Sequence, residues 1–412
     1  MSAPREDFAL DRDGLLEAIE LLERHAGGEP LPARTLLNLP DDLPEAGVGG
    51  REALAWLAPP LLGGAAGLGH PGYLAHMDPP TPWMSWAGAL WAAALSQNLL
   101  HPDSAPAARE LEPLVVGWLA EPFGMLGGHL VPGSSLATLT ALWAARELRG
   151  VERVVASGLS HLSVRKAAAI LGLEYVAVGV DDAHRMRAGE LAGVDLDRAA
   201  LVLTAGTVAG GAIDPLDAGG EAAWRHVDAA WAGPLRLSPR HRHLLDGVEA
   251  ADSVGVSAHK WLFQPKECGI VLFAEPDAAH EAISFGGGYL AAPNVGLLGS
   301  HGQTALPLAA TLLAWGRSGV AALVEHCMAI AERLAELVDA HPELELWRSP
   351  TTGVVLWRPR RVPAPAVRDG LSGALVSLTT VGEETWLRSV AANPSADPQL
   401  VLDRVLAALP SP

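Results

Sequence analysis

The chain has 412 residues, of which 49% are hydrophobic, and a formal net charge of -18 at pH 7. This length supports a large buried core and excludes a small scaffold held together by disulfides. The sequence has no run rich in Lys and Arg, and this disfavours a nucleic-acid surface. It has only two cysteines, and its first residues carry acids where a secretory leader has a basic start, so we expect a cytoplasmic setting.

Residues 1–69 are expected to form an N-terminal extension. Residues 14–25 have the apolar spacing of a helix, and the stretch 28–50 is rich in Pro, Gly and Asp, which is typical of a loop-rich arm. The apolar stretch 83–95 is short, is interrupted by Gly and Ser, and is followed by Gln97 and Asn98. We therefore expect no transmembrane helix there and no membrane partner.

The central part of the chain, residues 70–304, has the pattern of a large α/β domain. Short β-rich runs alternate with helical ones from about residue 128 to 275. The β-rich runs are VERVVAS (151–157), EYVAVGV (174–180), AALVLTA (199–205), WRHVDAA (224–230), DSVGVSA (252–258) and GIVLFAE (269–275). This alternation predicts an α/β fold with a mostly parallel central sheet covered by helices.

Residues 305–412 are expected to form a smaller C-terminal α/β domain. A long helical pattern begins at Leu306, short strands follow it, and a last helix is predicted near residues 398–409. The stretch from Pro359 to Val367 is typical of a surface connection.

Polar residues follow the predicted strands, where an open α/β sheet binds its ligands. They are Ser157, His161, Thr204, Thr207, Asp228, Ser257, His259 and Lys260. A pyridoxal phosphate (PLP) site needs a lysine that forms a Schiff base and a carboxylate beside the pyridine nitrogen, and Lys260 and Asp228 fit these roles. The segment 132–135, which opens a predicted helix, suits the phosphate. We expect no metal site.

Two segments, HVDAAWAG (226–233) and ADSVGVSAHKW (251–261), resemble the signature of the group II PLP-dependent amino-acid decarboxylases. This family includes the glutamate, aromatic-amino-acid and tyrosine decarboxylases. Five further segments resemble family segments in the same order: HPGYL (70–74), APAARELE (105–112), SGLSHLSVRKAA (157–168), TAGTVAGGAIDPL (204–216) and WLRSVAANPSADPQLVLDRVL (386–406). The resemblance implies PLP fold type I, the aspartate aminotransferase-like fold, and a homodimer with its active site near the interface.

The resemblance also implies a role for each matching residue. His161 would stack on the cofactor ring, Ala230 would pack on its other face, and Asp228 would pair with the pyridinium nitrogen. Ser134, Ser135, Ser257 and His259 would hold the phosphate, Thr207 would lie near the cofactor edge, and Lys260 would form the Schiff base. The implied reaction is decarboxylation of an L-amino acid to its amine and carbon dioxide.

The sequence departs from the family pattern at two places. Leu136 follows Ser134 and Ser135 where the family has a glutamate, and His301 stands where relatives have an arginine that can hold the substrate carboxylate. The connection from Lys260 to residue 306 is also short, and Tyr289 is the only tyrosine in it. The substrate-binding candidates are His76, Asn98, His101 and His301.

These departures leave two alternatives open. One is a PLP-dependent lyase, transaminase or oxidative decarboxylase that acts on an amino acid in a specialised biosynthetic pathway. The other is a family member without catalytic activity that serves as a binding or structural subunit. Lys260, Asp228 and His161 are all present, and this favours an enzyme.

Overall fold

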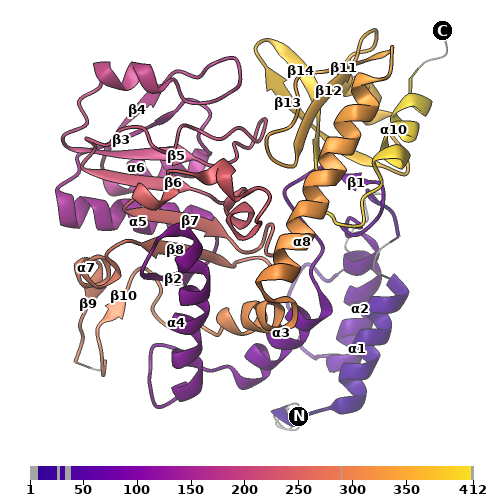
Figure 1. The fold of residues 1–412 in the computed structure, drawn as a ribbon. Coiled ribbons are helices and arrows are strands. Elements are labelled where there is room, and N and C mark those ends of the chain that lie inside the picture. The colour runs from indigo at the N-terminus through magenta and orange to yellow at the C-terminus, as the bar shows by residue number, and fades with distance from the viewer. Residues whose placement is uncertain (1–7, 26–27, 33–38, 289, 410–412) are drawn as a thin grey trace.

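A central seven-stranded sheet organises the protein, whose computed structural model describes residues 8–25, 28–32, 39–288 and 290–409 (Figure 1). The spatial order of its strands is β2-β8-β7-β6-β5-β3-β4. Strands β3 to β7 pair in parallel, and β8 pairs antiparallel with both β7 and β2. The bounds are β2 (Gly127–Val131), β3 (Arg153–Ser157), β4 (Glu174–Val178), β5 (Ala199–Thr204), β6 (Trp224–Asp228), β7 (Ser253–Ser257) and β8 (Gly269–Phe273).

The six strands predicted from the β-rich runs are all present, and the α/β fold class is confirmed. Strand β2 was not predicted, because two glycines and His129 interrupt its apolar pattern. Its pairing with β8 requires glycine, since a Cβ at Gly128 would lie 1.9 Å from the carbonyl oxygen of Val271.

Helices cover both faces of this sheet, so alternate residues of a strand enter two different cores. On β5, Ala200 and Val202 pack toward α5 (Ser134–Arg149) and α6 (Leu162–Leu171). Leu201 and Leu203 pack on the other face, in the core that includes α4 (Pro106–Ala120) and α8 (Ala305–Asp339). Burial on both faces explains why β5 and β8 are almost continuously apolar.

A second sheet has the order β1-β13-β14-β12-β11 and lies with the C-terminal part of the chain. It contains β1 (Tyr73–Leu74), β11 (Leu344–Leu346), β12 (Val354–Pro359), β13 (Leu375–Val381) and β14 (Glu384–Val390), with α9 (Ala364–Asp369) and α10 (Pro398–Ala407). Strand β1 pairs in parallel with β13, although we assigned its residues to the large domain. Sequence periodicity could not predict a two-residue strand that forms only through this distant partner. The boundaries at residues 69 and 304 otherwise stay a prediction.

The N-terminal part contains α1 (Arg12–His25), α2 (Gly50–Gly63) and α3 (Trp83–Leu95), and the structure has no helix or strand in residues 28–32 and 39–49. Helix α1 confirms the predicted helix. The predicted connection 359–367 contains the start of α9. The remaining elements are α7 (Pro276–Ala282), β9 (Ser284–Phe285), β10 (Asn294–Val295), η2 (Glu121–Phe123), η3 (Ala188–Gly193), η4 (Gly233–Leu237), η5 (Arg242–Leu245) and η6 (Val248–Ala250).

Helix α8 is the long helix predicted from Leu306. It has 35 residues and a break at Gly316, whose φ of 62° and ψ of 178° are not helical. By length and apolar composition alone it could also cross a membrane, which is weak evidence because core helices share these properties. Its buried residues belong to the same core as the central sheet. We therefore describe α8 as a core helix.

Candidate active site

The site lies at the carboxyl ends of neighbouring strands in the central sheet. Strand β6 ends at Asp228, and the register places this residue beside Thr204 of β5 and Gly255 of β7. Asp228 is 5% exposed, and its Oδ1 accepts a hydrogen bond from the backbone N–H of Ala230 at 3.1 Å. A buried carboxylate at this position can hold a positively charged ring nitrogen.

Lys260 lies in the tight turn after β7. Its backbone N–H donates to the carbonyl of Ser257 at 3.2 Å, and its carbonyl accepts from Phe263 at 2.8 Å. Behind it, Trp231 and Trp261 pack with ring centroids 4.0 Å apart. Burial lowers the pKa of Lys260, while the Asp228 carboxylate acts in the opposite direction. The lower pKa increases the fraction of neutral amine, which is the form that reacts with a carbonyl.

His161 is the N-cap of α6, and this capping fixes its ring. Its Nδ1 accepts from the backbone N–H of Ser163 at 3.2 Å and lies 2.7 Å from the Ser163 hydroxyl. Accepting at Nδ1 places the proton of the neutral imidazole on Nε2. Burial lowers the pKa of His161, and Asp228 and Lys260 also affect it by charge. The structure thus brings together the three residues predicted to be catalytic.

A cradle that suits a phosphate lies at the start of α5. No side chain caps this helix, and Leu136 and Ala137 are the first residues whose N–H groups bond back to Gly133. The N–H groups of Ser134 and Ser135 donate to no residue that the structure describes. Free N–H groups at a helix start bind anions.

His259 and Gly269 complete the cradle. A Cβ at Gly133 would lie 3.2 Å from Cε1 of His259, and a Cβ at Gly269 would lie 2.9 Å from the nitrogen of Ser134, so only glycine keeps this space open. Nε2 of His259 lies 3.4 Å from the Ser257 hydroxyl, and its buried Nδ1 has no partner among the described residues. Burial lowers the pKa of His259 to about 4. These residues fit a phosphorylated cofactor.

Two further predicted cofactor residues lie on loops next to the same strand ends. Thr207 is fully buried, and its hydroxyl accepts from the backbone N–H of Ala212 at 3.0 Å. This bond shapes the loop after β5 and leaves the hydroxyl hydrogen available. Ala230 is buried two residues after Asp228.

Comparisons with known proteins identify the family. The pyridoxal-dependent decarboxylase conserved domain matches residues 64–360. An L-2,4-diaminobutyrate decarboxylase from Rhizobium meliloti (strain 1021) is 32% identical over 403 residues, covering 88% of this chain and 81% of the relative. The chain belongs to the pyridoxal-dependent decarboxylases. It is a PLP-dependent amino-acid decarboxylase and thus a lyase, as the sequence predicted.

Solved structures have the same fold as this decarboxylase. The glutamate decarboxylase domain of a Vibrio parahaemolyticus diaminobutyrate-pyruvate transaminase and L-2,4-diaminobutyrate decarboxylase is 23% identical, with a TM-score of 0.85 over 98% of this chain and 99% of that chain. An Oryza sativa TDC with PLP and tryptamine is 22% identical, with a TM-score of 0.88 and 96% coverage of both chains. The predicted PLP fold type I is confirmed.

The decarboxylase also has a buried arginine near Lys260 that sequence reasoning missed. Arg388, on β14, is 6% exposed, and its Nε donates to the carbonyl of Val208 at 2.7 Å while Nη1 donates to the carbonyl of Ala75 at 3.2 Å. Its Nη2 bonds to none of the described residues. Burial lowers the pKa of Arg388 to about 10, so it stays charged at neutral pH. The quoted segment WLRSVAANPS contains this residue, but nothing in its local pattern indicated a role.

Three of the four predicted substrate residues lie together in the decarboxylase. The amide of Asn98 donates to the Ser300 hydroxyl at 3.1 Å, and the carbonyl of His301 accepts from Leu99 at 3.0 Å. The backbone N–H of His101 donates to the carbonyl of Asn98 at 3.2 Å.

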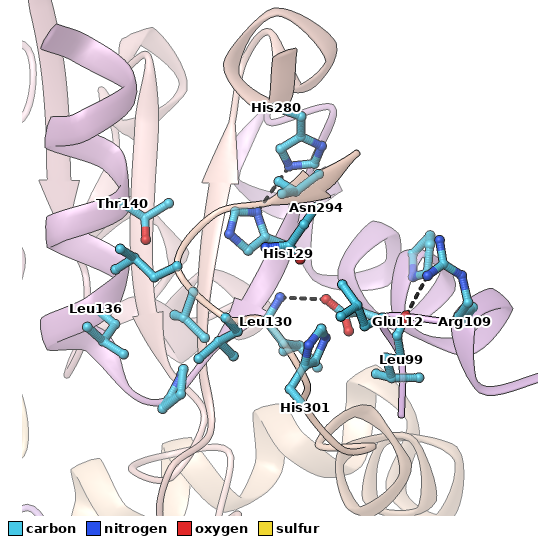
Figure 2. A pocket seen from close by; sticks show the side chains of 18 of the residues that line it. Leu99, Arg109, Glu112, His129, Leu130, Leu136, Thr140, His280, Asn294 and His301 are labelled. Carbon is cyan, nitrogen blue, oxygen red and sulfur yellow. Dashed lines mark hydrogen bonds between the residues drawn. The ribbon is translucent and has the colours of Figure 1, made fainter. Parts of the chain in front are cut away.

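His301 lines a cavity of about 250 Å³. Pro132 of the predicted phosphate segment also lines it, but none of the side chains predicted to hold the cofactor does. Figure 2 shows His301 beside Glu112, whose Oε1 accepts from Leu130 at 2.9 Å, with His129 and His280 farther along the cavity. Among the described residues no group of three or more His, Cys, Asp or Glu could hold a metal. The role of His301 toward the substrate stays a prediction, and Tyr289 lies outside the described residues.

His76, the fourth candidate, is exposed and does not line the cavity of His301. Burial lowers its pKa, and the charges of Asp78 and Arg388 also act on it. Neither His76 nor Arg388 lines the cavity of His301.

Proposed function

We propose that the Lys260 site removes the carboxyl group of an L-amino acid and releases the amine and carbon dioxide. The convergence of Lys260, Asp228 and His161 beside an open anion cradle carries this proposal. When bound, PLP supplies a ring that accepts the electrons left at Cα. Asp228 would hold the proton on the ring nitrogen, and His161 would restrict the ring to one orientation.

Arg388 is proposed to receive the substrate carboxylate, the role that we assigned to the arginine missing at His301. Its Nε and Nη1 are held by backbone carbonyls, so the guanidinium group is fixed before substrate arrives. The positive charge of Arg388 contributes to the lowered pKa of Lys260. Because a fixed cation orients a carboxylate, Arg388 would help to decide which Cα bond stands across the ring plane and breaks.

The products distinguish decarboxylation from the other reactions of this cofactor. We expect the purified holoenzyme to release amine and carbon dioxide in equal amounts from at least one member of a panel of L-amino acids. Both products would be quantified, together with aldehyde, keto acid and hydrogen peroxide. Aldehyde or keto acid without amine would instead support oxidative decarboxylation or transamination in a specialised pathway.

We also propose that a second copy of the chain covers α3. This helix has no charged residue, and Trp83, Trp91 and Leu95 are 70%, 62% and 60% exposed. An apolar surface of this kind is typical of a protein interface. The family resemblance supports a homodimer with the active site near its interface.

We also propose a cytoplasmic location. The buried free thiols Cys268 and Cys327 fit a reducing compartment of this kind.

The homodimer predicts a molar mass in solution of twice the 42.9 kDa of one chain. Trp91→Glu places a charge on the apolar face of α3 and should shift the protein toward monomer, measured by light scattering. Arg165→Glu, on the exposed side of α6, is a control that should leave the dimer intact. A wild-type protein that remains monomeric at micromolar concentration would contradict the dimer.

A further inference from the structure

A second carboxylate, Asp78, lies near Lys260 without a role in holding the cofactor. It comes four residues after the end of β1 and is 40% exposed. It forms an ion pair with Lys266, whose side chain is 57% exposed. Besides Asp228, Asp78 is the carboxylate whose charge raises the pKa of Lys260. Asp78 is thus a partly exposed negative charge that acts on the cofactor lysine.

One backbone segment holds Asp78 and Arg388 in a fixed relation. The carbonyl of Ala75 accepts from Nη1 of Arg388 at 3.2 Å and from the hydroxyl of Ser377 at 2.7 Å. Ser377 lies on β13, the strand that pairs with β1. The segment that leads to Asp78 is therefore anchored to the same strands that carry the buried arginine.

The partner of Asp78 comes from the loop that follows Lys260. Lys266 also lines a cavity between this loop, α3 and the start of α8, together with Gln264, Gln303 and Thr304. The ion pair therefore joins the segment after β1 to the loop of the cofactor lysine. Because both of its side chains are partly exposed, it contributes little stability and can exchange partners.

We propose that Asp78 selects amino acids whose side chain ends in an ammonium group, which takes the place of Lys266 in the ion pair. The proposal rests on the decarboxylation proposed above. A substrate of this class carries a carboxylate and a second cation, which complement Arg388 and Asp78. A side-chain carboxylate would be repelled by Asp78, and an aromatic side chain would gain nothing from its charge.

Pairs of substrates that differ only in the terminal charge test this selection. L-2,4-diaminobutyrate and L-norvaline form one such pair, and L-ornithine and L-norleucine form another. We expect wild-type kcat/KM to favour the charged member of at least one pair. Asp78→Asn should reduce that preference at least tenfold, mainly through KM, and leave the neutral member unchanged. Glu267→Gln, which neutralises an exposed acid on the same loop, should keep the wild-type preference.

Lys266→Met gives an independent result of opposite sign. Lys266 pairs with Asp78 when no substrate is bound. Its removal should lower KM for the charged substrate, because the ammonium group of the substrate then has no competitor for Asp78. An equal effect of Asp78→Asn on charged and neutral substrates, or a wild-type preference for the neutral members, would overturn the proposal.

A binding measurement separates this proposal from the reaction itself. The holoenzyme would be titrated with 1,3-diaminopropane and with butylamine, which has a methyl group in place of the second amine. The cofactor absorbance would be the signal. We expect tighter binding of the diamine, lost in Asp78→Asn. This difference would stand even if no amino acid were decarboxylated, whereas equal binding of both amines by wild type and variant would contradict the role of Asp78.

Discussion

Lys260→Ala should reduce kcat by about a thousandfold or more, because it removes the half-buried amine that we assign to the cofactor. The variant should still bind PLP through the cradle at α5, but its absorbance should be that of the free aldehyde. Activity on the best substrate of the panel and the visible spectrum would be measured together.

Lys166→Ala is the matched control for this experiment. Lys166 is exposed on α6, and the protein has only three lysines, at positions 166, 260 and 266. The control should retain wild-type activity and spectrum. Full activity in Lys260→Ala would contradict the assignment of Lys260 to the cofactor. This holds whatever activity is found when Lys166 or Lys266 is substituted.

Arg388→Gln should raise KM about a hundredfold, because loss of one partner from a buried charge pair costs about 2 to 5 kcal/mol. Arg388→Lys keeps the charge but not the fork that bonds to Val208 and Ala75, so its KM should lie between those of wild type and Arg388→Gln.

The product amine provides a control for folding in these Arg388 variants. The amine lacks the carboxylate, so its dissociation constant should change little while the KM of the amino acid rises. A variant that loses affinity for amine and amino acid alike would show a structural role for Arg388, and the proposed carboxylate contact would then be wrong.

The cofactor half of the site could be predicted from sequence because its residues follow strands that are continuous in the chain. Asp228 and Lys260 come directly at or after strand ends, and the parallel register of β5, β6 and β7 places those ends next to one another. The glycine at position 133 likewise marks the cradle before α5. In these cases a local pattern and a general rule of α/β sheets are sufficient.

The substrate half depends on contacts between distant segments, which a local pattern does not encode. Arg388 reaches the site only because β14 and β13 place it against the segment after β1, more than 300 residues earlier in the chain. For the same reason β1 was assigned to the large domain, and Asp78 was given no role. His301 was singled out by comparison with the family, but the cavity that it lines contains neither Lys260 nor Asp228.

Lys260 is the residue to which we assign the cofactor of this decarboxylase. Borohydride reduction of the holoenzyme, followed by peptide mass spectrometry, tests this assignment most directly, because only three lysines compete for the label. We expect the reduced pyridoxyl group on the peptide that contains Lys260, and none on Lys166 or Lys266. A label on either of those lysines, or no label after reconstitution with PLP, would contradict the assignment.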